Sequence, residues 1–266
     1  MGRIREAIGA ANSEGRAALL IYLPVGYPDL ATSEECLVAA AEAGADVLEV
    51  GFPFSDPIMD GPTIQAATQA ALDQGVRVAD DLALSERVTK RVDVPALVMT
   101  YYTIPDVRGI TTFAAEAVGA GLSGAILPDL PADEADPWLG AAAEAGLETV
   151  FLAAATSDDA RLDAIARAST GFVYATGLLG VTGVKDVDAG TAALVERIRR
   201  HTDGPVCVGV GVKTPDHARD VAAYADGVIV GSAVVKVVGE GDAAGAPERV
   251  AELVSSLRRG VERTRV

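Results

Sequence analysis

One pattern recurs eight times along the chain: a short apolar segment, a loop, and then an alanine-rich stretch of helical periodicity. Each apolar segment is hydrophobic at nearly every position, as a strand buried on both faces must be. The eight segments span residues 19–24, 47–50, 96–101, 124–128, 148–153, 171–175, 206–210 and 227–230. Eight alternations of strand and helix within 266 residues predict an α/β fold, a parallel (β/α)8 TIM barrel.

The stretches between the apolar segments predict helices, and several begin with residues that cap helices. The clearest helical stretches span residues 33–43, 133–145, 158–168, 190–201 and 215–223. Capping residues are expected at 32–33, 157–158 and 214–215, the last with a proline at the first helical position.

No linker divides the chain, so we expect a single domain over residues 1–266. The loosest stretch, residues 239–247, is short and is interpreted as a surface loop. An open, doubly wound sheet is the alternative architecture, and it normally carries a glycine-rich turn after the first strand. Here that turn reads PVGYP at residues 24–28, which is not a dinucleotide fingerprint, so the barrel is favoured.

Charge and composition exclude several classes of protein. The net charge of −16 argues against nucleic-acid binding, which requires a basic face. The sequence contains no run of 18 apolar residues, so no membrane span is predicted. The first 16 residues are charged and do not resemble a signal peptide. A cytoplasmic location is therefore expected. Cys36 and Cys207 are expected to be buried, reduced thiols. His201 and His217 lack metal-ligand spacing, and no metal site is expected.

The second apolar segment ends with a carboxylate, Glu49, in the sequence VLEVG at residues 47–51. A charged residue inside an apolar strand costs several kcal/mol when it is buried without a partner. One interpretation is a buried ion pair with a lysine or arginine, although the nearby sequence offers no basic residue. The alternative is a carboxyl group at the barrel mouth whose pKa is raised by desolvation, so that it exchanges protons near neutral pH.

The loop after this segment carries two further carboxylates, Asp56 and Asp60, between prolines that stiffen it. In a (β/α)8 barrel, the loops that follow the strands form the active site. Either aspartate could instead form an Asx turn or cap the helix that starts near Pro62.

Glycines follow the sixth, seventh and eighth apolar segments, at residues 177–183, 209–211 and 231. Small residues let an oxyanion approach backbone N–H groups, and glycines after the last strands of a barrel commonly form a phosphate site. Ser232 adds a hydroxyl donor. Tight turns alone are the alternative explanation, but three such loops together favour phosphate binding.

The sequence around Glu49 and Asp60 is similar to the signature of tryptophan synthase α subunits. The similarity is carried by AGADVLEVG at residues 43–51 and SDPIMDGPTIQ at residues 55–65, with GVTG at 180–183 and GSAVVK at 231–236. It covers essentially the whole chain. The resemblance implies retro-aldol cleavage of indole-3-glycerol phosphate to indole and glyceraldehyde 3-phosphate, a lyase reaction of tryptophan biosynthesis. It implies no metal or organic cofactor in this chain.

The resemblance also implies roles for individual residues. Glu49 is the expected general acid/base, and Asp60 is expected to face the indole nitrogen. The expected substrate contacts are Tyr22, Tyr101, Tyr174 and Thr182, the last of which would reach Asp60 when the sixth loop closes. The expected phosphate contacts are Gly183, Gly211, Gly231 and Ser232.

The family further implies a β subunit that carries pyridoxal phosphate, in an α2β2 heterotetramer, with Pro53 and Asp56 at the contact. The alternative is a stand-alone lyase that releases indole for a secondary pathway. A protein that only activates a β subunit is disfavoured, because both carboxylates are present, and another phosphate-handling barrel lacks the motif of strand two. The chain departs from the family pattern at Tyr27, Thr103 and residues 177–179, and the last departure bears on closure of the sixth loop.

Overall fold

A computed structural model describes residues 2–177 and 187–263 of the chain. Within them, eight parallel strands pair in sequence order and close into a barrel, which confirms the predicted fold. The strands are β1 Ala18–Pro24, β2 Val47–Gly51, β3 Ala96–Met99, β4 Gly124–Ile126, β5 Glu148–Ala153, β6 Phe172–Thr176, β7 Val206–Gly209 and β8 Gly227–Val230. The third strand ends at Met99, before the predicted residue 101, and the chain turns into a helix that begins at Thr103.

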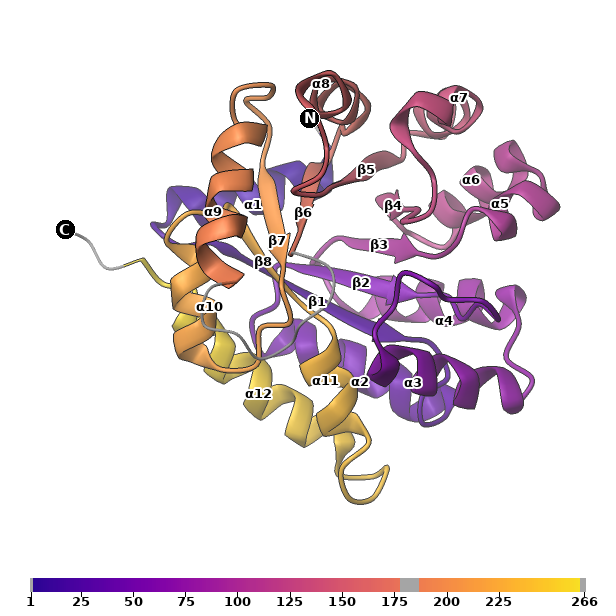
Figure 1. The fold of residues 1–266 in the computed structure, drawn as a ribbon. Helices are drawn as coiled ribbons and strands as arrows, with labels where there is room; N and C mark the ends of the chain where they lie inside the picture. Colours follow the sequence, from indigo (N-terminus) through magenta and orange to yellow (C-terminus); the bar gives the residue numbers. More distant parts are fainter. Residues whose placement is uncertain (1, 178–186, 264–266) are drawn as a thin grey trace.

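Helices form a layer around the strands (Figure 1). They are α1 Arg3–Ser13, α2 Leu30–Glu42, α3 Pro62–Asp73, α4 Val78–Arg91, α5 Thr103–Arg108, α6 Ile110–Gly119, α7 Asp136–Ala145, α8 Asp159–Ala168, α9 Val187–Ile198, α10 Pro215–Ala222, α11 Ser232–Val238 and α12 Ala246–Gly260, with a short 3-10 helix, η1, at Ala132–Glu134. The predicted helix at 133–145 is therefore divided, and Pro137 lies in the first turn of α7, where its missing N–H costs no helical hydrogen bond.

Two of the three predicted helix caps are confirmed. The side chain of Asp158 accepts a hydrogen bond from the backbone N–H of Arg161, and that of Thr214 accepts one from His217. The cap expected at residues 32–33 was wrong. Asp29 caps α2 instead, by accepting from the Thr32 N–H (2.8 Å), so the helix begins three residues earlier than predicted.

The hydrophobic core has two parts, as expected for a barrel surrounded by helices. Alternate strand residues form an inner cluster, including Leu20, Leu97 and Phe172, and the residues between them pack outward against the helices. Helix α1, which the sequence analysis did not predict, contributes Ile4 and Ile8 to the inner cluster. It therefore closes the barrel at the end where the strands begin.

Helix α1 is held there by Glu148, the first residue of β5. The Glu148 carboxylate accepts hydrogen bonds from the backbone N–H groups of Ile4 (2.8 Å) and Arg5 (3.1 Å). It thus satisfies amide groups at the start of α1 that have no partner within the helix. A residue 144 positions away in sequence therefore acts as the helix cap.

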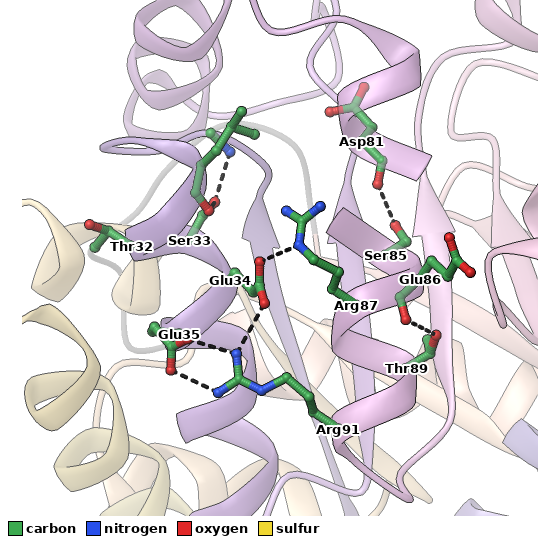
Figure 2. Close-up of polar contacts among 12 residues, drawn as sticks. Thr32, Ser33, Glu34, Glu35, Asp81, Ser85, Glu86, Arg87, Thr89 and Arg91 are labelled. Atoms are coloured by element: carbon green, nitrogen blue, oxygen red, sulfur yellow. Dashed lines mark hydrogen bonds and ion pairs between the residues drawn. The ribbon is translucent and has the colours of Figure 1, made fainter. Parts of the chain in front are cut away.

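Ion pairs join α2 to α4 on the outside of the barrel (Figure 2). Arg91 makes two hydrogen bonds to the Glu35 carboxylate (2.7 and 2.9 Å), and Arg87 donates to Glu34 (2.7 Å). Such exposed pairs typically contribute about 0–1 kcal/mol each, so packing rather than charge holds the two helices together.

Cys36 and Cys207 are both buried and free, as predicted. In the part of the chain that the structure describes, no helix is long and apolar enough to cross a bilayer.

Candidate active site

Glu49 lies near the carboxyl end of β2, inside the barrel. Side chains alternate along a strand, and Val47, two residues earlier, belongs to the inner cluster, so Glu49 also points inward. Its parallel neighbours in register are Tyr22 on β1 and Leu97 on β3. The Glu49 side chain is almost fully buried, with 1% of its surface exposed.

The Glu49 carboxyl has no ionic partner among the described residues, and its Oε1 atom has no hydrogen-bond partner there. The interpretation of Glu49 as half of a buried ion pair is therefore wrong for the described part of the chain. Burial raises the pKa of Glu49 from 4.5 to about 8. A carboxyl group with this pKa is mostly protonated at neutral pH and has a proton to donate.

Two tyrosines, Tyr22 on β1 and Tyr174 on β6, lie beside Glu49. Both are in the inward-pointing register of their strands, and the charges of Glu49 and Asp60 both raise their pKa, in addition to the larger effect of burial. The tyrosines therefore lie near both carboxyl groups. Because their pKa values are raised, their hydroxyls stay protonated and neutral at physiological pH.

Each of these tyrosines is accommodated by a glycine whose contact with the ring the sequence analysis did not predict. A Cβ atom at Gly51 would lie 2.5 Å from the Tyr22 hydroxyl, and one at Gly209 would overlap the Tyr174 hydroxyl. Only glycine leaves room for the rings at these strand ends. The signal available in the sequence is a glycine that ends an apolar strand beside an inward-facing tyrosine.

Asp60 lies in the loop between β2 and α3, and its carboxylate accepts a hydrogen bond from the Tyr101 hydroxyl (3.1 Å). Burial raises the pKa of Asp60 to about 6, and the hydrogen bond from Tyr101 opposes this rise. The N-cap position of α3 is occupied by Gly61, without a side-chain cap, so neither aspartate caps this helix. Asp60 is therefore ionised at neutral pH, whereas Glu49 is mostly protonated.

Three of the four expected phosphate contacts, Gly211, Gly231 and Ser232, lie just beyond the ends of the neighbouring strands β7 and β8. Gly211 has a positive φ of 70°, which favours glycine, and a Cβ atom placed there would meet no atom within 4 Å. Gly231 and Ser232 are partly exposed at the start of α11. The fourth expected phosphate contact, Gly183, and the expected substrate contact Thr182 lie outside the described residues, as do Leu178 and Leu179.

The loop between β2 and α3 also presents residues to the surface. Asp56 is exposed and accepts a hydrogen bond from the Ser55 hydroxyl (2.6 Å), whereas Pro53 is buried within the chain. Two large apolar side chains, Ile58 and Met59, are exposed by 79% and 42%. A groove of about 480 Å³ runs between this loop and α3.

The described residues contain no group of three histidine, cysteine, aspartate or glutamate side chains placed to hold a metal ion. What they contain is a protonated carboxyl group, an ionised one and two neutral tyrosines at the carboxyl ends of the strands. The fold and this site define a class of protein, a (β/α)8-barrel enzyme whose side chains can move a proton and stabilise positive charge.

Comparisons with known proteins identify the family. The sequence profile described as "Tryptophan synthase alpha chain" matches residues 8–263. Two similar relatives are the tryptophan synthase alpha chains of Leifsonia xyli (46% identity, 98% of this chain and 100% of the relative) and Streptomyces coelicolor (47% identity, 97% and 96%). A solved structure of Mycobacterium tuberculosis tryptophan synthase superposes with a TM-score of 0.92 at 43% identity, over 99% of both chains.

The chain belongs to the tryptophan synthase alpha chain family. Enzymes of this family are lyases of tryptophan biosynthesis that cleave indole-3-glycerol phosphate, and this chain is one of them. The family resemblance seen in the sequence around residues 43–65 is thereby confirmed.

Proposed function

We propose that Glu49 and Asp60 together carry out the retro-aldol cleavage of indole-3-glycerol phosphate. The observation that carries this proposal is the environment of Glu49, a buried carboxyl with an unpartnered oxygen at the barrel mouth. Its pKa of about 8 makes it a proton donor near neutral pH. Asp60, with a pKa of about 6, is the anion of the pair.

The reaction needs both a proton donor and an anion. An aromatic carbon cannot leave as a carbanion, so the indole ring is first protonated at C3, by the Glu49 carboxyl. Positive charge then develops at the indole nitrogen, where Asp60 stabilises it. As the carbon–carbon bond breaks, the Glu49 carboxylate takes the proton of the glycerol hydroxyl, and its original protonation state is restored.

The rest of the substrate is placed by the surrounding loops. Tyr22 and Tyr174 flank the ring site as neutral walls beside both carboxyl groups. Gly211, Gly231 and Ser232 hold the phosphate through backbone N–H groups and a hydroxyl, which suits a chain with a net charge of −16. Contacts from Thr182 and Gly183 stay predictions, since these residues lie outside the described part of the chain.

The chain works with a β subunit in an α2β2 heterotetramer, and pyridoxal phosphate is carried by that β subunit rather than by this chain. Exposed Asp56, with Ile58 and Met59, supports a contact surface beside the active-site loop. Pro53 is buried within the chain, whereas Asp56 is exposed, so Asp56 is the better candidate for a contact with the β subunit. We further propose that the chain, residues 1–266, acts as a single domain in the cytoplasm.

The experiment is steady-state cleavage of indole-3-glycerol phosphate by the purified chain, with and without a β subunit from the same source. Indole formation that increases strongly on addition of the β subunit supports the subunit function. High activity of the chain alone, with no association at micromolar concentrations, would favour the stand-alone lyase. No cleavage under either condition would contradict both.

A further inference from the structure

Tyr101 lies just beyond β3 and is tied to the active-site loop by three contacts. Its ring stacks on Phe54, with centroids 5.0 Å apart and planes 19° from parallel. Its hydroxyl accepts a hydrogen bond from the Met59 N–H (2.9 Å) and donates one to the Asp60 carboxylate (3.1 Å). The Tyr101 side chain is 4% exposed, and both hydrogen bonds are partly buried.

The surroundings of Asp60 make the hydrogen bond from Tyr101 the main interaction that favours its ionised form. The titratable groups that face its carboxylate are the hydroxyls of Tyr22 on β1, Tyr101 beyond β3 and Tyr174 on β6. Within residues 2–177 and 187–263, Asp60 forms no ion pair with an arginine, lysine or histidine, and Tyr101 is the one side chain that donates to it. Burial alone would favour the protonated form of Asp60.

We propose that Tyr101 is a positioning residue, whose hydroxyl keeps the Asp60 carboxylate ionised and aims it at the substrate. This inference rests on the proposed function of Asp60. It also revises the role expected for Tyr101, because a hydroxyl that already donates its one proton to Asp60 has none to donate to the substrate.

The same contacts link Asp60 to the surface of the loop. Phe54 and Met59, which hold the Tyr101 ring and hydroxyl, belong to the same loop as exposed Asp56. A displacement of this loop therefore changes the direction of the Tyr101 hydroxyl, and with it the hydrogen bond on Asp60.

The test is the variant Tyr101→Phe, which keeps the ring and its stacking on Phe54 but removes the hydroxyl. Tyr102→Phe is the matched control, because it removes a hydroxyl from the neighbouring residue, whose backbone bonds elsewhere. The pH profile of kcat and the titration of the Asp60 carboxyl, followed by carbon NMR with Asp60→Asn to assign its resonance, are measured for each protein.

We expect Tyr101→Phe to move both the acid limb of kcat and the Asp60 titration upward by about one pH unit, the size of one lost hydrogen bond. At pH values below the acid limb, kcat of Tyr101→Phe is then about tenfold lower than that of the parent. Tyr102→Phe should leave both the acid limb and the Asp60 titration unchanged. An Asp60 titration that is unchanged in Tyr101→Phe would overturn the inference.

The outcomes separate this inference from the function of Asp60. If Asp60→Asn retains the acid limb and full kcat, the proposed function of Asp60 fails, and the NMR titration still decides whether Tyr101 controls its ionisation. If Asp60→Asn abolishes turnover while Tyr101→Phe leaves the limb and the titration unchanged, only the role of Tyr101 is refuted.

Discussion

Replacing Glu49 by glutamine should lower activity and raise stability at the same time. Glutamine keeps the shape of the side chain but cannot donate the proton that cleavage requires. General acid–base catalysis contributes about 10²- to 10⁴-fold to a rate. We therefore expect kcat for indole release to fall by at least about a hundredfold, which corresponds to about 3 kcal/mol or more in activation free energy.

The effect on stability follows from the raised pKa of Glu49. The unfolded chain loses this proton near pH 4.5, whereas the folded protein keeps it until about pH 8. Stability therefore falls as pH rises through this window. At 1.36 kcal/mol per unit, the 2.5 units between pH 4.5 and pH 7 correspond to a loss of about 3 kcal/mol in the free energy of unfolding. Glutamine does not ionise, so Glu49→Gln should lack this pH-dependent loss.

Asp81→Asn is the matched control for this variant. Asp81 on α4 is also almost fully buried, its Oδ1 atom is also unpartnered within the described residues, and burial likewise raises its pKa. Asp81→Asn should therefore share the gain in stability, measured by urea unfolding at pH 5 and pH 8, but keep normal turnover. Turnover like the parent's in folded Glu49→Gln would refute the catalytic role, and a pH-independent stability difference would refute the assignment of the raised pKa.

Three further predictions concern the other site residues. Asp60→Asn should lower kcat more than it raises KM, because the charge that Asp60 meets develops mainly in the transition state; a rise in KM alone would make Asp60 a binding group. Gly211→Glu, which places an anion in the phosphate site, should abolish competition by glycerol phosphate and its binding in calorimetry; unchanged affinity would move the site elsewhere. Asp56→Ala should weaken association with a β subunit by about 1–3 kcal/mol if the contact is desolvated, with cleavage by the isolated chain unaffected; equal affinities would exclude Asp56 from the interface.

The barrel and its principal carboxyl group could be predicted because both depend on local sequence. Eight apolar segments are recognisable without knowledge of their neighbours, and Glu49 is conspicuous as a charged residue within one of them. The ends of some elements were misplaced because more than one nearby residue could form the helix cap. For example, the cap of α2 was predicted at residues 32–33, but Asp29 supplies it.

The features that were missed depend on contacts between residues far apart in sequence. Helix α1 has a charged sequence, and its partners Glu148 and the inner cluster lie on strands distant in the chain. Similarly, the hydrogen bond from Tyr101 to Asp60 joins residues 41 positions apart. The need for glycine at residue 51 becomes visible only when the Tyr22 ring is placed over it.

The pH dependence of indole-3-glycerol phosphate cleavage tests the central claim most directly, that a protonated Glu49 starts the reaction. The measurement is kcat/KM between pH 5 and pH 10 for the purified chain, since this ratio reports the ionisation of the free enzyme. With the pKa of Glu49 at about 8, the ratio should fall tenfold for each pH unit above that value. A ratio that stays level or rises between pH 8 and pH 10 would contradict the account.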